Sequence, residues 1–236
     1  MIKVIVCGAK GRMGRVSCAA VDAAADMELV AAIDHGDSLV DALVKHQPQA
    51  VVDFTIPDCV FENTKTVIEH GASPIVGASG LTAEQVKALQ QLCSQKNIGG
   101  LIAPNFSLGA VLMMQAAAQI SKHFPQAEII EMHHDQKIDS PSGTAVKTAQ
   151  MMSPAGAPPF AEQRARGETE NNIPIHSVRL PGLFAHQMVL FGGEGESLTI
   201  RHDSFDRESM MPGVLLSIRR SQQLSELVYG LEHLLD

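Results

Sequence analysis

IKVIVCGAKGRMG, residues Ile2–Gly14, joins a short apolar run to three glycines spaced three residues apart. The apolar run has the length of a buried strand, and a helical pattern follows the glycines. Leu29–Ile33 is a second apolar run, and it ends at Asp34. A strand, a glycine turn, a helix and a second strand closed by an acid form the pattern of a dinucleotide-binding βαβ unit. We therefore expect a Rossmann-type sheet at the start of the chain.

The chemistry of this unit predicts nucleotide binding. Glycines let the backbone approach a pyrophosphate, and a helix N-terminus favours its charge. Asp34 stands where a carboxylate accepts hydrogen bonds from the adenosine ribose, and it would repel a 2′-phosphate. This favours NADH, but four nearby residues leave NADPH open, and these are Lys10, Arg12, Arg15 and His35. The alternative is a glycine-rich turn that serves packing only.

Further strand-like runs alternate with helical patterns and extend the parallel sheet. They lie at Ala50–Phe54, Pro74–Val76 and Ile98–Ala103. Ligands of such sheets bind beyond the carboxyl ends of the strands. The segments at that edge are Phe54-Thr55, Gly77-Ala78-Ser79 and Ala103-Pro104-Asn105-Phe106. We expect at least two of these three segments to contact the cofactor, although each can also be an ordinary connecting loop.

The pattern changes in the second half of the chain. Ile173–Leu180, Ala185–Phe191 and Ser197–His202 are strand candidates with no helix between them, which indicates an antiparallel or mixed sheet. The expected fold class is α/β, with a doubly wound parallel sheet of Rossmann type and a second α+β domain. We place a dinucleotide-binding domain at 1–104, completed by a C-terminal helix at 213–236. A substrate-binding and oligomerisation domain occupies 105–212.

EMHHDQKIDSPSGTA, residues Glu131–Ala145, is the stretch of the second domain with the most chemistry. It follows an apolar strand run, and a helix pattern begins near Pro141. A helix start at this point favours an anion near Ser142, Gly143 and Thr144. Titratable or positive groups accompany it, namely His133, His134 and Lys137. This composition suits a site that binds a small acid and protonates it.

The two histidines also have less specific interpretations. They can be structural residues or a pair of metal ligands. Adjacent residues of a strand face opposite ways, so both imidazoles can serve one pocket only if the strand ends or bulges there. Because ionisable groups of several kinds gather around them, we favour a functional site.

Composition and charge limit the classes of partner that we expect for this chain. The formal net charge is −8 at pH 7, and lysine and arginine do not cluster, so neither nucleic acid nor an anionic membrane is an expected partner. No apolar run is long enough to span a bilayer. The four cysteines form no Cys-x-x-Cys pair, which argues against a zinc ribbon or redox motif. We expect a soluble cytoplasmic protein without a bound metal.

Three stretches together resemble the dihydrodipicolinate reductase family, the 4-hydroxy-tetrahydrodipicolinate reductases of the diaminopimelate route to lysine. They are Val6–Gly14, Val52–Thr55 and Glu131–Ala145. The last follows the family signature E-x-H-H-x-x-K-x-D-x-P-S-G-T-A. The resemblance covers nearly the whole chain, but it is poor between Ser153 and Asn172, which leaves the role of Arg164 and Arg166 open.

The resemblance implies an activity and roles for residues. The family reduces the cyclic product of aspartate semialdehyde and pyruvate with NADH or NADPH, and is typically a homotetramer assembled through the second sheet. By resemblance His133 is the catalytic proton donor or acceptor and Lys137 a second proton donor. His134, with the backbone and hydroxyls around Gly143 and Thr144, binds the dicarboxylate substrate. The implied cofactor contacts are Gly8, Ala9, Lys10, Gly11, Arg12, Met13, Asp34, Gly77, Ala78, Ser79, Ala103, Pro104, Asn105 and Phe106.

Three other functions compete with this interpretation. Another NAD(P)-dependent dehydrogenase of amino-acid metabolism would share the two-domain plan without needing His-His-x-x-Lys. A non-catalytic NAD(H)-binding regulator would bind nucleotide without turnover. A metal hydrolase would use the histidines as ligands, but the chain lacks a His-x-x-x-His helix.

Overall fold

The computed structural model describes residues 1–124, 126–152 and 167–235, which form two compact units. The first unit comprises Met1–Leu108 and Met210–Asp236, and the second comprises Gly109–Ser209. The turn-rich segment at 153–159 lies outside the described residues, as do Arg164 and Arg166.

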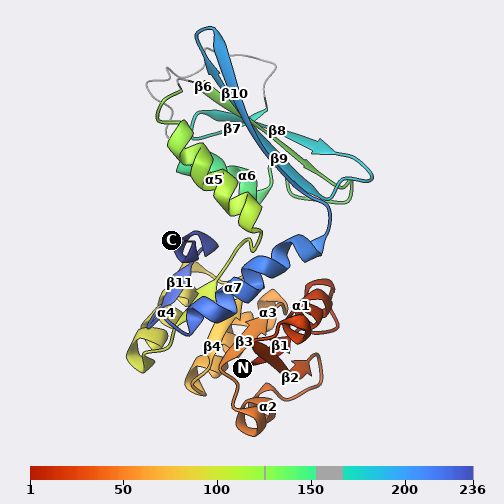
Figure 1. The fold of residues 1–236 in the computed structure, drawn as a ribbon, viewed down its shortest axis with the longest axis vertical. Helices are drawn as coiled ribbons and strands as arrows, with labels where there is room; N and C mark the ends of the chain where they lie inside the picture. The colour runs from red at the N-terminus through yellow and green to blue at the C-terminus, as the bar shows by residue number, and fades with distance from the viewer. Residues whose placement is uncertain (125, 153–166, 236) are drawn as a thin grey trace. The chain divides into compact units, whose positions relative to one another are not determined.

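Six strands form the sheet of the first unit, in the order β11-β5-β4-β3-β1-β2 (Figure 1). All neighbouring pairs are parallel. The strands are β1 (Ile2–Cys7), β2 (Met27–Ile33), β3 (Ala50–Asp53), β4 (Ser73–Val76), β5 (Gly100–Ile102) and β11 (Leu227–Tyr229). The chain order reverses beside β1, and this is the switch point at which such sheets bind their ligands.

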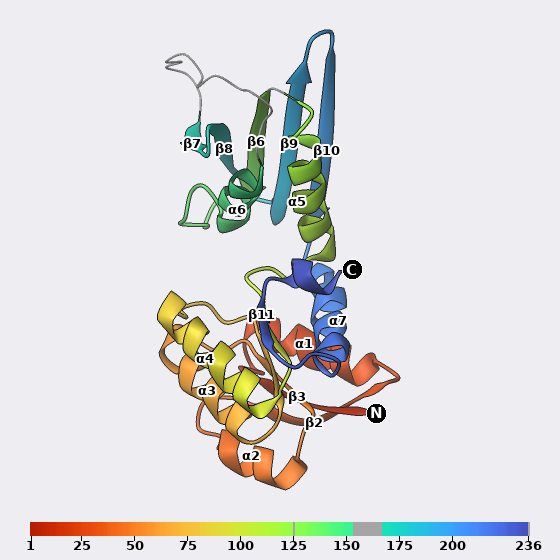
Figure 2. The same cartoon turned by 90° about the vertical axis from the view of Figure 1, so that its left-hand side faces the viewer.

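Helices cover both faces of this sheet, so the expected doubly wound fold is confirmed (Figure 2). On one face lie α1 (Arg12–Ala23) and α7 (Met211–Ser221), which meet where Ser17 contacts the sulfur of Met211. On the other face lie α2 (Leu39–His46), α3 (Pro57–Glu69) and α4 (Ala83–Lys96).

Burial on both faces explains why the strands read as continuous apolar runs. Val4, Ile5 and Val6 are all fully buried although their side chains alternate between the two faces.

Local signals set the helix ends. Thr82 and Gln85 form a capping box at the start of α4, with the side chain of each accepting the backbone N–H of the other.

The predicted C-terminal helix at 213–236 is wrong beyond α7. The chain instead forms β11, which pairs in parallel with β5, and then a short 3-10 helix, η2 (Leu231–Leu234). Leu227, Leu231 and Leu234 are buried, and their spacing imitates one face of a helix. The strand forms because its hydrogen-bonding partner is β5, which lies far away in the sequence.

The second unit carries a mixed sheet in the order β10-β9-β6-β8-β7, as predicted from its consecutive strands (Figure 1). The strands are β6 (Gln126–His133), β7 (Glu168–Glu170), β8 (Ile173–Arg179), β9 (Ala185–Gly193) and β10 (Glu196–Ser204). The central strand β6 is parallel to β8 and antiparallel to β9. β7 was not predicted, and Glu194 and Gly195 form the hairpin turn between β9 and β10.

One face of this sheet packs against α5 (Leu108–Ile120) and α6 (Gly143–Met151), around Ile129, Ile175 and Phe191. After β10 comes a short 3-10 helix, η1 (Arg207–Met210). The alternation along β6 sends Ile129, Glu131 and His133 to the face that the helices cover. Polar residues of the signature therefore enter the edge of an apolar core.

Candidate active site

The glycine turn after β1 has a backbone that only glycine fits. Gly8 has φ +74°, and a Cβ atom there would lie 2.6 Å from the carbonyl oxygen of Phe54. The N–H of Gly11 donates to the carbonyl of Gly8 at 3.0 Å, which closes the turn. Gly11 is also the N-cap residue of α1, and no side chain caps this helix. The first turn of α1 is thus open to an anion.

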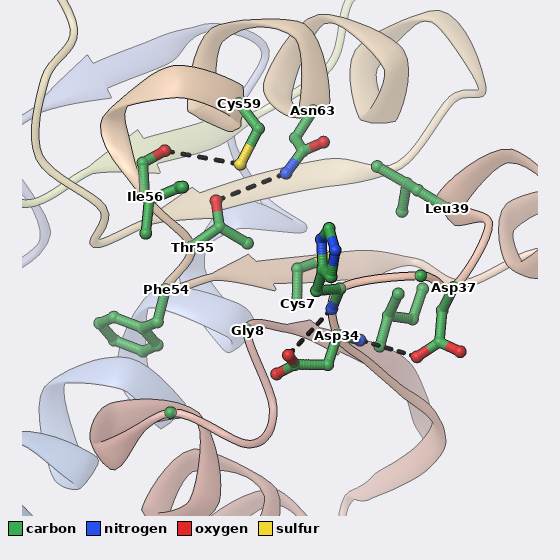
Figure 3. A pocket seen from close by; sticks show the side chains of 14 residues that line it. Cys7, Gly8, Asp34, Asp37, Leu39, Phe54, Thr55, Ile56, Cys59 and Asn63 are labelled. Carbon is green, nitrogen blue, oxygen red and sulfur yellow. Dashed lines mark hydrogen bonds between the residues drawn. The ribbon is translucent and has the colours of Figure 1, made fainter.

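A cavity of about 400 Å³ lies beside this turn at the carboxyl ends of β1, β2 and β3 (Figure 3). Five of the predicted cofactor residues line it, namely Gly8, Gly11, Asp34, His35 and Phe54. The other predicted contacts are not among its lining residues: Ala9, Lys10, Arg12, Met13, Gly77, Ala78, Ser79, Ala103, Pro104, Asn105 and Phe106.

Asp34 ties the end of β2 to the glycine turn. Its carboxylate accepts the backbone N–H of Lys10 at 2.7 Å and that of His35 at 2.9 Å. These two hydrogen bonds hold the pKa of Asp34 below its usual value, so the group is charged at neutral pH. Each carboxylate oxygen keeps a further lone pair for a ribose hydroxyl. The cavity, the uncapped start of α1 and the Asp34 carboxylate together fit NADH or NADPH.

The later βα loops are fastened to neighbouring strands at the same edge. The N–H of Gly77 donates to the carbonyl of Asp53 at 2.9 Å, and that of Ala103 donates to Val76 at 2.9 Å. Phe54 and Phe106 meet edge to face with ring centroids 5.7 Å apart. A side chain at Gly77 would overlap the ring of Phe54, which accounts for the glycine.

The second unit gathers a buried ionic cluster at the end of β6. Glu131 is fully buried, and its Oε2 lies 2.6 Å from Nδ1 of His133. Arg179, beside His133 in the parallel register of β8, donates from Nη1 to Oε2 at 2.9 Å and from Nη2 to Oε1 at 2.7 Å. The backbone N–H of Ser142 donates to Oε1 at 3.2 Å. One carboxylate therefore holds an imidazole, a guanidinium and the residue that precedes α6.

The charge of this carboxylate is fixed by its partners. Burial alone would raise the pKa of Glu131, but hydrogen bonds from His133 and Arg179 outweigh it and lower the pKa to about 2. An anionic acceptor at Nδ1 requires that nitrogen to carry its proton. In the neutral imidazole Nε2 then carries no proton, and the side chain of His133 is 16% exposed.

The start of α6 differs in detail from the prediction. The helix begins at Gly143, two residues after Pro141, because the side chain of Ser142 caps it by accepting the N–H of Ala145 at 3.3 Å. Ser142 is buried, and its hydroxyl and N–H are both engaged within the protein. Gly143 is exposed, and nothing lies within 4 Å of where a Cβ would be.

Two further signature residues lie in the loop between β6 and α6. His134 follows the last residue of β6, so the strand ends between the two histidines, which is the arrangement that lets both serve one pocket. Nζ of Lys137 contacts both carboxylate oxygens of Asp139, at 2.6 and 2.7 Å. That pairing lowers the pKa of Asp139, and the backbone carbonyl of Asp139 accepts a hydrogen bond from Arg179.

Sequence reasoning missed three residues of these sites. Glu131 opens the signature and lies two residues before His133, and this spacing could have indicated that the two side chains share a strand face. No pattern in the sequence pointed to Arg179, because its place beside His133 depends on the register of β8. Asp37 lines the cavity and accepts the N–H of Asp34 at 2.9 Å, although it is three residues beyond the predicted ribose acid.

The described residues contain no group of three or more His, Cys, Asp or Glu side chains placed to hold a metal ion. Across the same residues, no helix has the length and apolar character that crossing a membrane requires.

A Rossmann-type unit with an acid at the end of its second strand, joined to a mixed α+β unit, defines the class of NAD(P)-dependent two-domain oxidoreductases. Comparison with known proteins names the family within this class. Residues 2–106 match the family model for the N-terminus of dihydrodipicolinate reductase, and 109–235 match the model for its C-terminus. The chain belongs to the dihydrodipicolinate reductase family.

Relatives and solved structures agree with this assignment. The chain is 51% identical over 238 residues to 4-hydroxy-tetrahydrodipicolinate reductase of Coxiella burnetii strain Dugway, covering 99% of each chain. It is 49% identical over 263 residues to the reductase of the same name from Listeria welshimeri, covering all of both. A structure of dipicolinate-bound dihydrodipicolinate reductase from Paenisporosarcina sp. TG-14 superposes with a TM-score of 0.92 at 42% identity, covering 100% of both chains. The alternatives of another dehydrogenase or a non-catalytic regulator are not favoured.

Proposed function

We infer that this protein reduces 4-hydroxy-tetrahydrodipicolinate to tetrahydrodipicolinate with NADH or NADPH, in the diaminopimelate route to lysine. One observation carries the inference: the buried Glu131 carboxylate joins the His133 imidazole to the start of α6, in a chain whose full-length relatives have this activity in their names. Reduction of a cyclic dicarboxylate imine requires a proton donor and a site for the substrate carboxylates, and a histidine beside a helix N-terminus can supply both.

The site residues divide the chemistry among them. NADH or NADPH supplies the hydride when bound. As negative charge builds on the electron-poor ring, the imidazolium form of His133, protonated on both nitrogens, donates its Nε2 proton and becomes the neutral Nδ1–H tautomer, and Lys137 is the second proton donor. His134, Ser142, Gly143 and Thr144 bind the two carboxylates, supported by the dipole of α6. Ser142 acts chiefly by shaping the helix start, since its polar groups already bond within the protein.

The two domains have separate tasks in this proposal. Residues 1–104, completed by the C-terminal segment from 213, bind the cofactor through the glycine turn, Asp34 and the βα loops that carry Phe54, Gly77–Ser79 and Ala103–Phe106. Residues 105–212 bind the substrate and form the oligomer. The cavity beside Gly8 and the hydrogen bonds of the βα loops support the first task.

The decisive experiment is a coupled assay in which aspartate semialdehyde and pyruvate generate the substrate afresh, followed by oxidation of NADH or NADPH at 340 nm. We expect turnover with that mixture and none when either precursor is left out. Nucleotide binding without turnover would instead favour a regulator. Turnover with simple hydroxy or amino acids would favour another dehydrogenase.

We expect NADH to be the better cofactor, with kcat/KM about tenfold above that for NADPH, because Asp34 and Asp37 both line the cavity and repel a 2′-phosphate. Asp37→Asn should raise kcat/KM for NADPH severalfold with little change for NADH, since an amide oxygen can still accept the N–H of Asp34. Asp41→Asn, in α2 and outside the cavity lining, is the control. If the ratio of kcat/KM for NADH to kcat/KM for NADPH is the same in Asp37→Asn as in the unmodified protein, Asp37 does not contribute to cofactor selection.

Lys137→Ala should lower kcat about tenfold or more and raise KM, because it removes both a proton donor and a positive charge that faces the substrate. Lys147→Ala is the matched control, since Lys147 is an exposed residue of α6. Steady-state kinetics of both variants test this role. If Lys137→Ala matches Lys147→Ala in both constants, the pairing of Lys137 with Asp139 is structural only.

The oligomer is a homotetramer assembled through the second sheet. The face of that sheet opposite α5 and α6 presents partly exposed apolar side chains, namely Ile130, Met132, Val178, Met188 and Leu190. Burying such a face against other copies would remove apolar surface from water. Sedimentation velocity should give the mass of four chains, and Met188→Lys should lower it; a monomer at micromolar concentration would refute the assembly.

The cytoplasm is the compartment we propose. All four cysteines are free thiols, and Cys7 and Cys93 are buried as such, which suits a reducing environment. Fractionation of cells that express the tagged protein tests this location.

A further inference from the structure

The buried cluster around Glu131 has more connections than a structural ion pair needs. A carboxylate paired with one arginine is already neutralised, yet Glu131 also accepts from Nδ1 of His133 and from the backbone of Ser142. Both additional partners belong to the signature that supplies the chemistry. The two oxygens divide the partners: Oε2 takes His133 and Nη1 of Arg179, while Oε1 takes Ser142 and Nη2 of Arg179.

We infer that Glu131 is a positioning residue for the reaction: held by Arg179, it fixes His133 in the Nδ1–H tautomer and leaves Nε2 to exchange the proton. This inference rests on the proposed function and names a residue that acts through His133 without touching the substrate. Arg179 has the supporting task, since its fork binds both oxygens and so prevents rotation of the carboxylate.

The geometry favours positioning over simple packing. Glu131 and His133 are two residues apart on one strand, so their side chains share a face and the imidazole can tilt onto the carboxylate. Nη2 of Arg179 also donates to the carbonyl of Asp139 at 2.8 Å, which ties the loop carrying Lys137 to the same cluster. Carboxylate–histidine pairs of this kind select the tautomer and orientation of the imidazole in other enzymes.

Glu131→Gln is the central variant. The amide has one acceptor oxygen where the carboxylate has two, so it cannot serve both the fork of Arg179 and Nδ1 of His133. We expect kcat to fall about a hundredfold, with KM changing less than threefold, because His133 is misaligned while the residues that bind the substrate carboxylates are unchanged. Asp26→Asn is the control: it breaks another two-point Arg–carboxylate pair, with Arg219, in the first unit.

A double-mutant comparison separates positioning from a general structural effect. If Glu131 acts through His133, adding Glu131→Gln to His133→Gln should leave the residual kcat unchanged within twofold. A double variant whose loss of kcat equals the product of the two single losses would overturn the inference. Full kcat in the single variant Glu131→Gln would overturn it as well. Dipicolinate binding and the thermal midpoint show whether each variant is folded, since a half-buried arginine that loses its partner can destabilise the fold.

One measurement needs no variant of Glu131 and no activity. Nitrogen-15 NMR of imidazole-labelled protein, with His133 assigned by comparison with His133→Gln, reports which ring nitrogen carries the proton. We expect the Nδ1–H form in the neutral imidazole, and a dominant Nε2–H form would overturn the inference. Lack of turnover by the unmodified protein would instead contradict the proposed function and leave this result standing.

Discussion

His133→Gln is expected to lose between about a hundredfold and ten-thousandfold in kcat, with a smaller change in KM. The reason is that glutamine preserves much of the size and polarity of the side chain but cannot donate a proton near neutral pH. Its amide can still bond Glu131, so the buried carboxylate stays partnered and the fold is preserved. Steady-state kinetics with freshly generated substrate measure the loss.

A contrast variant makes this result specific. His134→Gln should act mainly on KM, because we assign His134 to binding of the substrate carboxylates and not to proton transfer. Dipicolinate affinity, measured by calorimetry, should be near that of the unmodified protein in His133→Gln. Full turnover in His133→Gln would show that the proton comes from elsewhere, and Lys137 would then be the leading candidate.

Gly14→Ala is expected to disrupt the first unit. Gly14 is a buried residue of α1, and a methyl group on it would overlap the carbonyl oxygen of Gly8 and crowd Ala9. These are backbone atoms, so no flexible side chain can move aside, and the turn or the helix must shift. Overpacking of this kind destabilises by about 1–3 kcal/mol. For a chain of this size that corresponds to a lowering of the thermal midpoint by several degrees.

The loss of cofactor binding should exceed the loss of stability. A shifted turn moves the first N–H groups of α1 away from the pyrophosphate, so the Kd for NADH should rise at least about tenfold. Gly192→Ala is the matched control, because Gly192 has open space around it and a backbone that alanine adopts freely. Nucleotide fluorescence and a thermal melt test both claims, and dipicolinate binding reports on the second unit. If Gly14→Ala matches Gly192→Ala in both its Kd for NADH and its thermal midpoint, Gly14 is needed neither for cofactor binding nor for stability.

Short-range patterns in the sequence predicted most of the first unit correctly. The apolar runs of β1 and β3 and the glycines after β1 each appear where a local rule places them, and the start of α4 is fixed by a capping box between residues three apart. These features depend on side-chain periodicity, backbone freedom and hydrogen bonds within a few residues, and all three are legible along the chain. β11 escaped prediction because a strand of three residues has too little periodicity of its own, and its stability depends on pairing with β5 and on burial of Leu227.

The candidate active site divides in the same way. The sequence alone indicated which residues can donate protons and that a helix starts close to them, since Glu131–Ala145 is contiguous and its residue types carry the chemistry. Only the tertiary structure decided which nitrogen of His133 holds a proton, because that depends on Glu131. The state of Glu131 in turn depends on Arg179, which is 48 residues away and arrives through the register of β8 with β6. Pairing between distant strands is a long-range packing outcome, and no local pattern of residues encodes it.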